Sequence, residues 1–132
     1  MVVGIGTDIC DAQRIAAVLE NSADRFLKKI FTLAEREAGL SKPKPEAYFA
    51  KRFAAKEAIY KALQPSGVAG RGWQDAEILN DADGAPTVRL DGACKRALEA
   101  MTPSGYNAHV DLSLSDEWPY AVAFVVISVR PS

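Results

Sequence analysis

The stretch 45–63, PEAYFAKRFAAKEAIYKAL, constrains the fold of this chain more than any other part of the sequence. Drawn as a helix with about 3.6 residues per turn, it has an aromatic stripe on one side and a row of alanines on another. A helix that is apolar around most of its circumference is buried or lies at an interface. The sequence therefore predicts one long helix at the centre of the fold.

Two charged residues of this helix stand in unfavourable places. Lys56 falls inside the aromatic stripe, and Glu57 lies at its edge. A charge among apolar side chains is costly unless it has a partner. Lys56 and Glu57 are therefore either a structural pair or parts of a functional site, and the N-terminal segment described below favours a functional site.

Length and composition predict one globular domain over residues 1–132. Hydrophobic residues make up 48% and charged residues 25% of the chain, as in an average soluble protein. No apolar run approaches the roughly 18 residues of a membrane span, and no signal peptide is evident. We therefore expect a cytoplasmic protein without a membrane partner, and we interpret the two cysteines as small core residues.

The net charge of −1 hides an asymmetry between the two halves of the chain. Residues 1–61 carry 11 Lys/Arg against 8 Asp/Glu, and residues 62–132 carry 5 against 9. A positive half indicates an anionic partner. The excess is too small for a nucleic-acid-binding domain, so no nucleic acid is expected.

Periodicity and turn residues predict an α+β fold with an antiparallel sheet packed on the long helix. Thr32 and Glu35 form a capping box that starts a short helix. The residues between 64 and 72 are rich in glycine and are expected to form a loop. Strands are expected over 1–8, 73–79, 87–90, 108–114 and 120–129, and further helices over 11–20, 25–31 and 91–101.

Asp8 and Glu57 are the candidate metal ligands. Asp8 ends the predicted first strand beside Gly4 and Gly6, whose backbone bends or approaches a ligand easily; its alternative role is to cap the next helix, although Asp11 could do so instead. Mg²⁺ is typically bound by one or two carboxylates plus waters and substrate phosphates. With Lys/Arg on the same helix, this set suggests metal-assisted phosphoryl transfer.

Two motifs in this order resemble the holo-acyl-carrier-protein synthase family, the small 4′-phosphopantetheinyl transferases. They are GIGTDI at 4–9 and RFAAKEAIYKAL at 52–63. The resemblance extends to Arg14-Ile15, WQDAEI at 73–78, the Gly84-Ala-Pro86 turn and LSLSDEWPYAVA at 112–123, and so covers nearly the whole chain. It implies transfer of phosphopantetheine from coenzyme A to a serine of apo acyl carrier protein, which releases adenosine 3′,5′-bisphosphate.

The resemblance also implies roles for individual residues. Asp8 and Glu57 would hold Mg²⁺, and Lys61 would stabilise the phosphate charge or help to take the proton of the serine. The base itself stays open between Glu57 and a metal-bound water. Coenzyme A would be bound by Arg52, Lys56, Lys61, Gly67, Pro86 and Thr87, and the carrier protein by Arg14, Arg25 and Lys28. The family further implies a homotrimer with its active sites between subunits.

The chain departs from the family pattern at three places. Tyr60 replaces a small polar residue and is expected to crowd or repack the pocket beside Glu57. Gln64-Pro65-Ser66 replaces a glycine-containing segment, and Asp116 stands where many members have a histidine.

Two other functions remain open from the residues. One is a different Mg²⁺-dependent phosphoryl-transfer or nucleotide-hydrolysing enzyme that uses the same carboxylates. The other is a non-catalytic adaptor that binds carrier proteins through the basic helices, with Lys56 and Glu57 as a purely structural pair.

Overall fold

A computed structural model describes all residues 1–132, and its central element is the helix predicted at 45–63. That helix, α3, spans Pro45–Ala62 and has its proline in the first turn, where the missing N–H is not needed. The other elements are β1 (Val2–Asp11), α1 (Ala12–Ile30), α2 (Leu33–Leu40), β2 (Ala76–Asn80), β3 (Pro86–Leu90), α4 (Gly92–Ala100), β4 (Tyr106–Glu117) and β5 (Tyr120–Pro131), with 3₁₀ turns η1 (Gln64–Ser66) and η2 (Trp73–Asp75).

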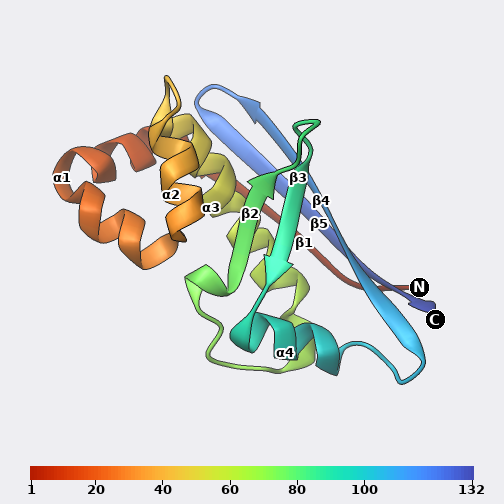
Figure 1. The fold of residues 1–132 in the computed structure, drawn as a ribbon. Helices are drawn as coiled ribbons and strands as arrows, with labels where there is room; N and C mark the ends of the chain where they lie inside the picture. The colour runs from red at the N-terminus through yellow and green to blue at the C-terminus, as the bar shows by residue number, and fades with distance from the viewer.

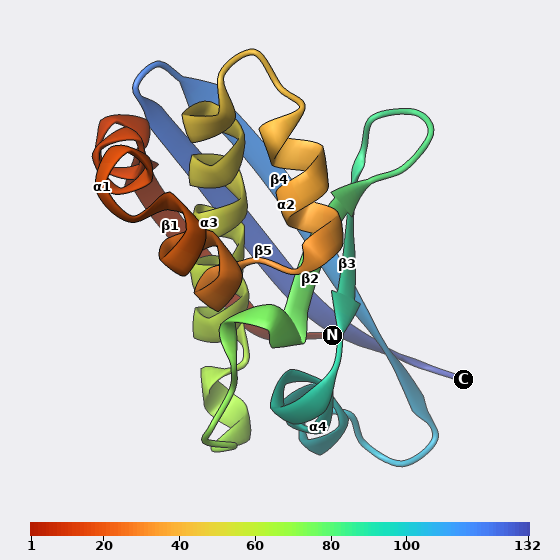
Figure 2. The same ribbon diagram turned by 60° about the vertical axis from the view of Figure 1, so that its left-hand side comes forward.

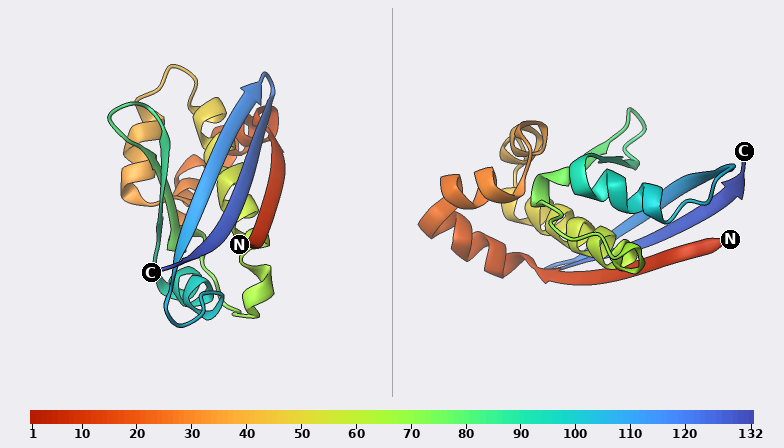
Figure 3. Two further views of the ribbon diagram at one scale, coloured as in Figure 1. Left: turned by 90° about the vertical axis from the view of Figure 1, so that its right-hand side faces the viewer. Right: turned by 90° about the horizontal axis from the view of Figure 1, so that it is seen from below.

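The elements form layers around α3. A three-stranded antiparallel sheet, in the order β1-β5-β4, lies against one side of the helix (Figure 1). Helices α1 and α2 and the antiparallel β2–β3 hairpin lie on the opposite side, as the turned view in Figure 2 shows. The view from below in Figure 3 shows α3 between these layers. The predicted α+β fold, with an antiparallel sheet on a long central helix, is therefore confirmed.

Two glycines allow α3 to lie close to β1. A Cβ built on Gly4 would be 2.2 Å from the carbonyl oxygen of Ala62, and one on Gly6 would be 1.9 Å from that of Ala58. No other residue fits at such a distance. The glycines thus serve the contact between helix and sheet, which differs from the expected approach to a ligand.

Asp8 lies inside a strand, not at its end as expected. β1 continues to Asp11 because β5 pairs with it along this length, with Asp8 opposite Ala123 and Asp11 opposite Tyr120. The carboxylate of Asp11 accepts a hydrogen bond from the Gln13 amide at 2.8 Å and caps α1. Asp8 is therefore free of the capping role that was its alternative.

Most of the other predicted helix caps, helix breaks and strand starts can be compared with the structure. Thr32 and Glu35 form the predicted capping box, and the expected break in the first helical region occurs at Ser22, whose φ of −149° is not helical. The expected strand 73–79 begins only at Ala76, because the backbone of Trp73 turns in η2 and its carbonyl accepts a hydrogen bond from Lys56. The loop 64–72 contains one 3₁₀ turn, η1, which was not expected.

The outer face of the three-stranded sheet is apolar and exposed. Ile5 is 63% and Ile9 62% exposed on β1, and Phe124 is 48% exposed on β5. Thr7 lies directly opposite Phe124, so these side chains form one surface. Contiguous apolar patches of this kind mark interaction sites. None of the helices is long and apolar enough to cross a membrane.

Candidate active site

Asp8 and Glu57, which come from β1 and α3, line the same cavity. Its volume is about 650 Å³, and 8 of its 11 lining residues are hydrophobic. Arg14 of α1 is the one cation among them. The structure thus brings the two predicted metal ligands together at the polar edge of a mostly apolar cavity.

The electrostatics of this edge favour a bound cation. Partial burial raises the pKa of Glu57, the negative charge of Asp8 raises it further, and Lys61 opposes both. The ammonium of Lys61 donates to the Asp8 carboxylate at 3.1 Å and to the Thr7 carbonyl at 2.9 Å. The Glu57 carboxylate has no such partner, so a cation beside it would relieve the repulsion between the two acids.

The donor set fits Mg²⁺ that is shared with a phosphate-bearing substrate. No group of three or more His, Cys, Asp or Glu side chains could hold a metal ion without further ligands. Mg²⁺ needs only one or two carboxylates when waters and phosphate oxygens complete its octahedron. Asp8 and Glu57 meet this requirement.

An aromatic row forms one wall of the cavity. Phe26 and Phe53 stack with ring centroids 6.4 Å apart, and Phe53 stacks on Trp73 at 5.2 Å. Tyr60 continues the row with its ring centroid 5.4 Å from that of Trp73. The Tyr60 hydroxyl donates to the carbonyl of Gly72, and Tyr60 does not line the cavity. Of the two expectations for Tyr60, it does not crowd the space beside Glu57, but it packs on Trp73, which lines the cavity.

Arg52 lies in a second, cationic cavity of about 500 Å³. Its guanidinium lies 4.3 Å from the centre of the Tyr48 ring, and its Nη2 donates to the Asn80 side chain at 2.9 Å. The residue is 2% exposed, yet its buried Nε has no partner. Pro86 lines this cavity, as do Lys42, Lys44 and Lys51, which the sequence analysis missed. The only signal for Lys42 and Lys44 was the Ser41–Pro45 connector, where lysine and proline alternate, and Lys51 lies on α3.

The predicted coenzyme-binding residues are thus divided within one chain. The carboxylate cavity and the cationic cavity have no lining residue in common. Gly67, with a φ of +71°, ends η1 and lines neither cavity, and Thr87 is exposed on β3 beside Pro86. One chain alone does not bring all these residues to one place.

The prediction that Lys56 binds phosphate is contradicted by its position. Its side chain is 0% exposed, and its ammonium lies 2.9 Å from the buried carboxylate of Glu35. The structural pair considered for Lys56 therefore exists, but with Glu35 of α2 in place of the neighbouring Glu57. Successive residues on a helix point about 100° apart, so Lys56 and Glu57 face different surroundings.

The residues expected to meet a carrier protein are exposed on α1. Arg14 lies at the carboxylate cavity, and Lys28 is paired with Asp24 at 3.2 Å. Both cysteines are buried, as expected, and burial raises the pKa of each thiol to about 11. Neither is a nucleophile at neutral pH.

Comparisons with known proteins identify one family. Residues 4–123 match the model of the 4′-phosphopantetheinyl transferase superfamily. The chain is 47% identical to the holo-[acyl-carrier-protein] synthase of Rhodopseudomonas palustris (strain BisA53), over 99% of this chain and 97% of that protein. The structure of the Neisseria meningitidis enzyme of the same name has a TM-score of 0.78 and 36% identity, with 97% of this chain and 99% of that chain covered.

A third relative has a bound ligand. The structure of the Helicobacter pylori holo-[acyl-carrier-protein] synthase in complex with coenzyme A has a TM-score of 0.75 and 27% identity, with 94% of this chain and 99% of that chain covered. The family match spans most of the sequence and includes both motifs that carry the resemblance. The chain therefore belongs to the 4′-phosphopantetheinyl transferase superfamily, among the holo-[acyl-carrier-protein] synthases.

Proposed function

We propose that this protein transfers the 4′-phosphopantetheine group of coenzyme A to a serine of apo acyl carrier protein. The observation that carries the proposal is the pair of carboxylates, Asp8 and Glu57, with Lys61 beside them at the edge of an apolar cavity. This set can bind a cation and a diphosphate together, as phosphoryl transfer requires.

The reaction exchanges one phosphorus–oxygen bond for another. The serine hydroxyl oxygen attacks the phosphorus that carries pantetheine, the bond to the second phosphate breaks, and adenosine 3′,5′-bisphosphate leaves. Mg²⁺ held by Asp8 and Glu57 would supply charge neutralisation at the diphosphate. The side chain of Lys61 is 52% exposed, and its ammonium is able to turn from Asp8 to a phosphate oxygen.

Glu57 is the proton acceptor that we assign for the serine. Burial and the charge of Asp8 raise its pKa in the metal-free protein, whereas bound Mg²⁺ would oppose this shift, so the assignment rests on the position of Glu57 at the cavity. Its carboxylate has no hydrogen-bond donor within the protein, which leaves it available to the substrate.

The cationic cavity supports binding of the phosphate-rich adenine nucleotide end of coenzyme A. The unpartnered Nε of Arg52 is a buried donor without an acceptor, which a phosphate oxygen would satisfy. Lys42, Lys44 and Lys51 add positive charge around it. Pro86 lines the same cavity, and we place Thr87 and Gly67 at its margins in the assembled enzyme.

We propose that the active enzyme is a homotrimer, the assembly that the family resemblance implies. The two cavities that would share one coenzyme A have no lining residue in common within a chain, which supports a site completed by a neighbouring copy. The exposed apolar face around Ile5, Ile9 and Phe124 is the surface that such a copy would cover.

The carrier protein would dock on α1. Arg14, Arg25 and Lys28 are exposed cations on this helix, and Arg14 also lines the carboxylate cavity. A carrier bound there would bring its serine to Asp8 and Glu57. Cations of this kind act mainly on the association rate.

The direct test is to incubate the protein with coenzyme A, Mg²⁺ and an apo acyl carrier protein and to follow the carrier by intact mass spectrometry. We expect the wild type to add one phosphopantetheine, and Asp8→Ala and Glu57→Ala each to abolish transfer while their circular dichroism stays unchanged. Lys95→Met, an exposed lysine on α4, is the control variant.

Other outcomes would favour other functions. No mass gain with several apo carriers would refute the transferase proposal. Nucleotide hydrolysis without a carrier would favour a different phosphoryl-transfer enzyme, and a carrier complex without chemistry would favour an adaptor.

The assembly is tested separately by native mass spectrometry. We expect three copies for the wild type and a monomer for Phe124→Asp, because a charge in the apolar face prevents its burial. Mixing Glu57→Ala with Arg52→Ala chains should restore part of the activity if sites are shared. A fully active monomer would contradict the shared site.

A further inference from the structure

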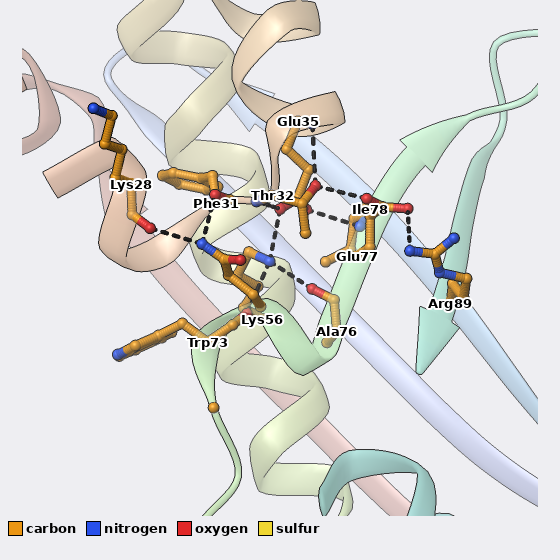
Figure 4. A network of polar contacts seen from close by, with 12 residues as sticks. Lys28, Phe31, Thr32, Glu35, Lys56, Trp73, Ala76, Glu77, Ile78 and Arg89 are labelled. Atoms are coloured by element: carbon orange, nitrogen blue, oxygen red, sulfur yellow. Dashed lines mark hydrogen bonds and ion pairs between the residues drawn. The ribbon is translucent and has the colours of Figure 1, made fainter. Parts of the chain in front are cut away.

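The buried ammonium of Lys56 joins three segments of the chain, as Figure 4 shows. It lies 2.9 Å from a carboxylate oxygen of Glu35 in α2 and donates to the carbonyls of Trp73 and Ala76 at 3.0 and 2.5 Å. A lysine has three N–H donors, so all of them are used. No donor remains for a substrate.

The hydrogen-bonding groups of Glu35 are also all used. One carboxylate oxygen accepts from the Thr32 amide at 2.9 Å, and the other accepts from the Ile78 amide of β2 at 2.8 Å. The Thr32 hydroxyl continues the network to Glu77, to which it donates at 2.6 Å (Figure 4). Every polar group is satisfied, and such a network defines one geometry for α2, α3 and the start of β2.

This network reaches the candidate active site through Trp73. The Trp73 carbonyl accepts from Lys56, while its indole lines the cavity of Asp8 and Glu57. Trp73 lies in the short turn η2, where no strand partner holds it. The Gln74 side chain, which donates to the Lys28 and Phe31 carbonyls, and the Asp91 amide, which donates to the Asp75 carbonyl at 2.8 Å, are further anchors of this turn.

We propose that Lys56 is a positioning residue of the transfer reaction, which holds the Trp73 wall against the cavity beside Glu57 without touching the substrate. The inference rests on the proposed function. Reacting groups that are misplaced by about 1 Å lose about 100-fold in rate. A shift of the wall would therefore lower kcat even if coenzyme A still bound.

The experiment removes both charges of the pair together. Lys56→Met alone leaves the Glu35 carboxylate buried and unpaired and is expected to unfold easily. The double variant Glu35→Gln/Lys56→Met avoids an unpaired buried charge and should therefore lose less stability than Lys56→Met, although an amide accepts only one of the two backbone N–H bonds that Glu35 accepts. Both chains are made with Trp118→Phe, which leaves Trp73 as the single tryptophan.

We expect the double variant to fold with a denaturation midpoint between those of its parent and of Lys56→Met. Its kcat should fall by about 10–100-fold, while KM for coenzyme A changes little. Trp73 fluorescence should shift to the red and be quenched more easily by acrylamide. Lys95→Met should change none of these quantities.

Three results would overturn the inference. An unchanged kcat in the folded double variant would show that the network is only structural. A raised KM at constant kcat would show that Lys56 contacts the coenzyme. Unchanged Trp73 fluorescence would show that Lys56 does not hold the wall, and this result stands even if the wild type transfers nothing, which would refute the proposed function separately.

Discussion

Two lysines five residues apart on α3 each pair with a carboxylate from a distant segment, and their surroundings differ completely. Lys56 and Glu35 are both 0% exposed, whereas Lys61 is 52% exposed and its partner Asp8 is 18% exposed. The separations, 2.9 and 3.1 Å, are nearly equal. Distance alone therefore does not distinguish a structural ion pair from one that a ligand could replace; burial and the number of filled donors do.

The buried Lys56–Glu35 pair connects α3 with α2. The exposed Lys61–Asp8 pair can exchange partners. Water and substrate reach the ammonium of Lys61, so breaking its bond to Asp8 costs little. Neither water nor substrate reaches Lys56, so breaking its bond leaves an uncompensated charge in the core. Four predictions test this contrast, from the largest expected effect to the smallest.

Lys56→Met should lower the free energy of unfolding by about 3–5 kcal/mol, because Glu35 would remain charged in the core without its cation. Equilibrium urea denaturation measures this loss. Lys95→Met, on the surface of α4, is the control. A loss below about 1 kcal/mol would mean that the pair is less buried in solution than in the structure.

Lys61→Met should lower the activity strongly and change the stability little. Removal of one group that stabilises developing charge costs about 10²–10³-fold in kcat, while unfolding should change by at most about 1 kcal/mol. Carrier modification under saturating coenzyme A gives the first quantity and urea denaturation the second. If stability falls as much as in Lys56→Met, the two pairs are of one kind and the contrast is wrong.

Salt should separate the two pairs further. From 0.1 to 1 M ionic strength the screening length falls from about 10 to about 3 Å, which weakens exposed pairs and leaves buried pairs almost unchanged. The stability lost in Lys61→Met, at most about 1 kcal/mol at low salt, should shrink toward zero. The loss in Lys56→Met should stay constant, and an equal response of both variants would contradict this.

Glu57, beside Asp8, gives a smaller test of how burial affects a charged group. Burial and Asp8 raise the pKa of Glu57 above its ordinary value, so the folded protein keeps this proton to higher pH than the unfolded chain does. The charged form therefore destabilises the fold at neutral pH. Without divalent cations, Glu57→Gln should make the protein slightly more stable at pH 7.

This gain should disappear as the pH is lowered well below about 4.3, the ordinary pKa of glutamate, because Glu57 is then neutral in both states. Denaturation curves at several pH values measure it. Addition of Mg²⁺ should stabilise the wild type and not the variant. A stability difference that does not depend on pH would show that ionisation of Glu57 is not its cause.

The sequence alone determined the local structure and the chemical type of the site. The helix at 45–63, the Thr32–Glu35 capping box and the break near Ser22 follow from neighbours within one or two helical turns, so periodicity and capping residues were enough. Asp8 and Glu57 were identified as a pair because their motifs resemble a known family, and the structure places them in one cavity.

Only the tertiary structure decided which charges pair and which surfaces are covered. Lys56 binds Glu35, 21 residues earlier in the sequence, because α2 docks on α3 and β2 closes over both. The lysines of the Ser41–Pro45 connector gather around Arg52 for the same kind of reason. A helical pattern specifies which side of α3 a residue occupies, but the partner on that side comes from a segment whose position depends on the packing of the whole chain.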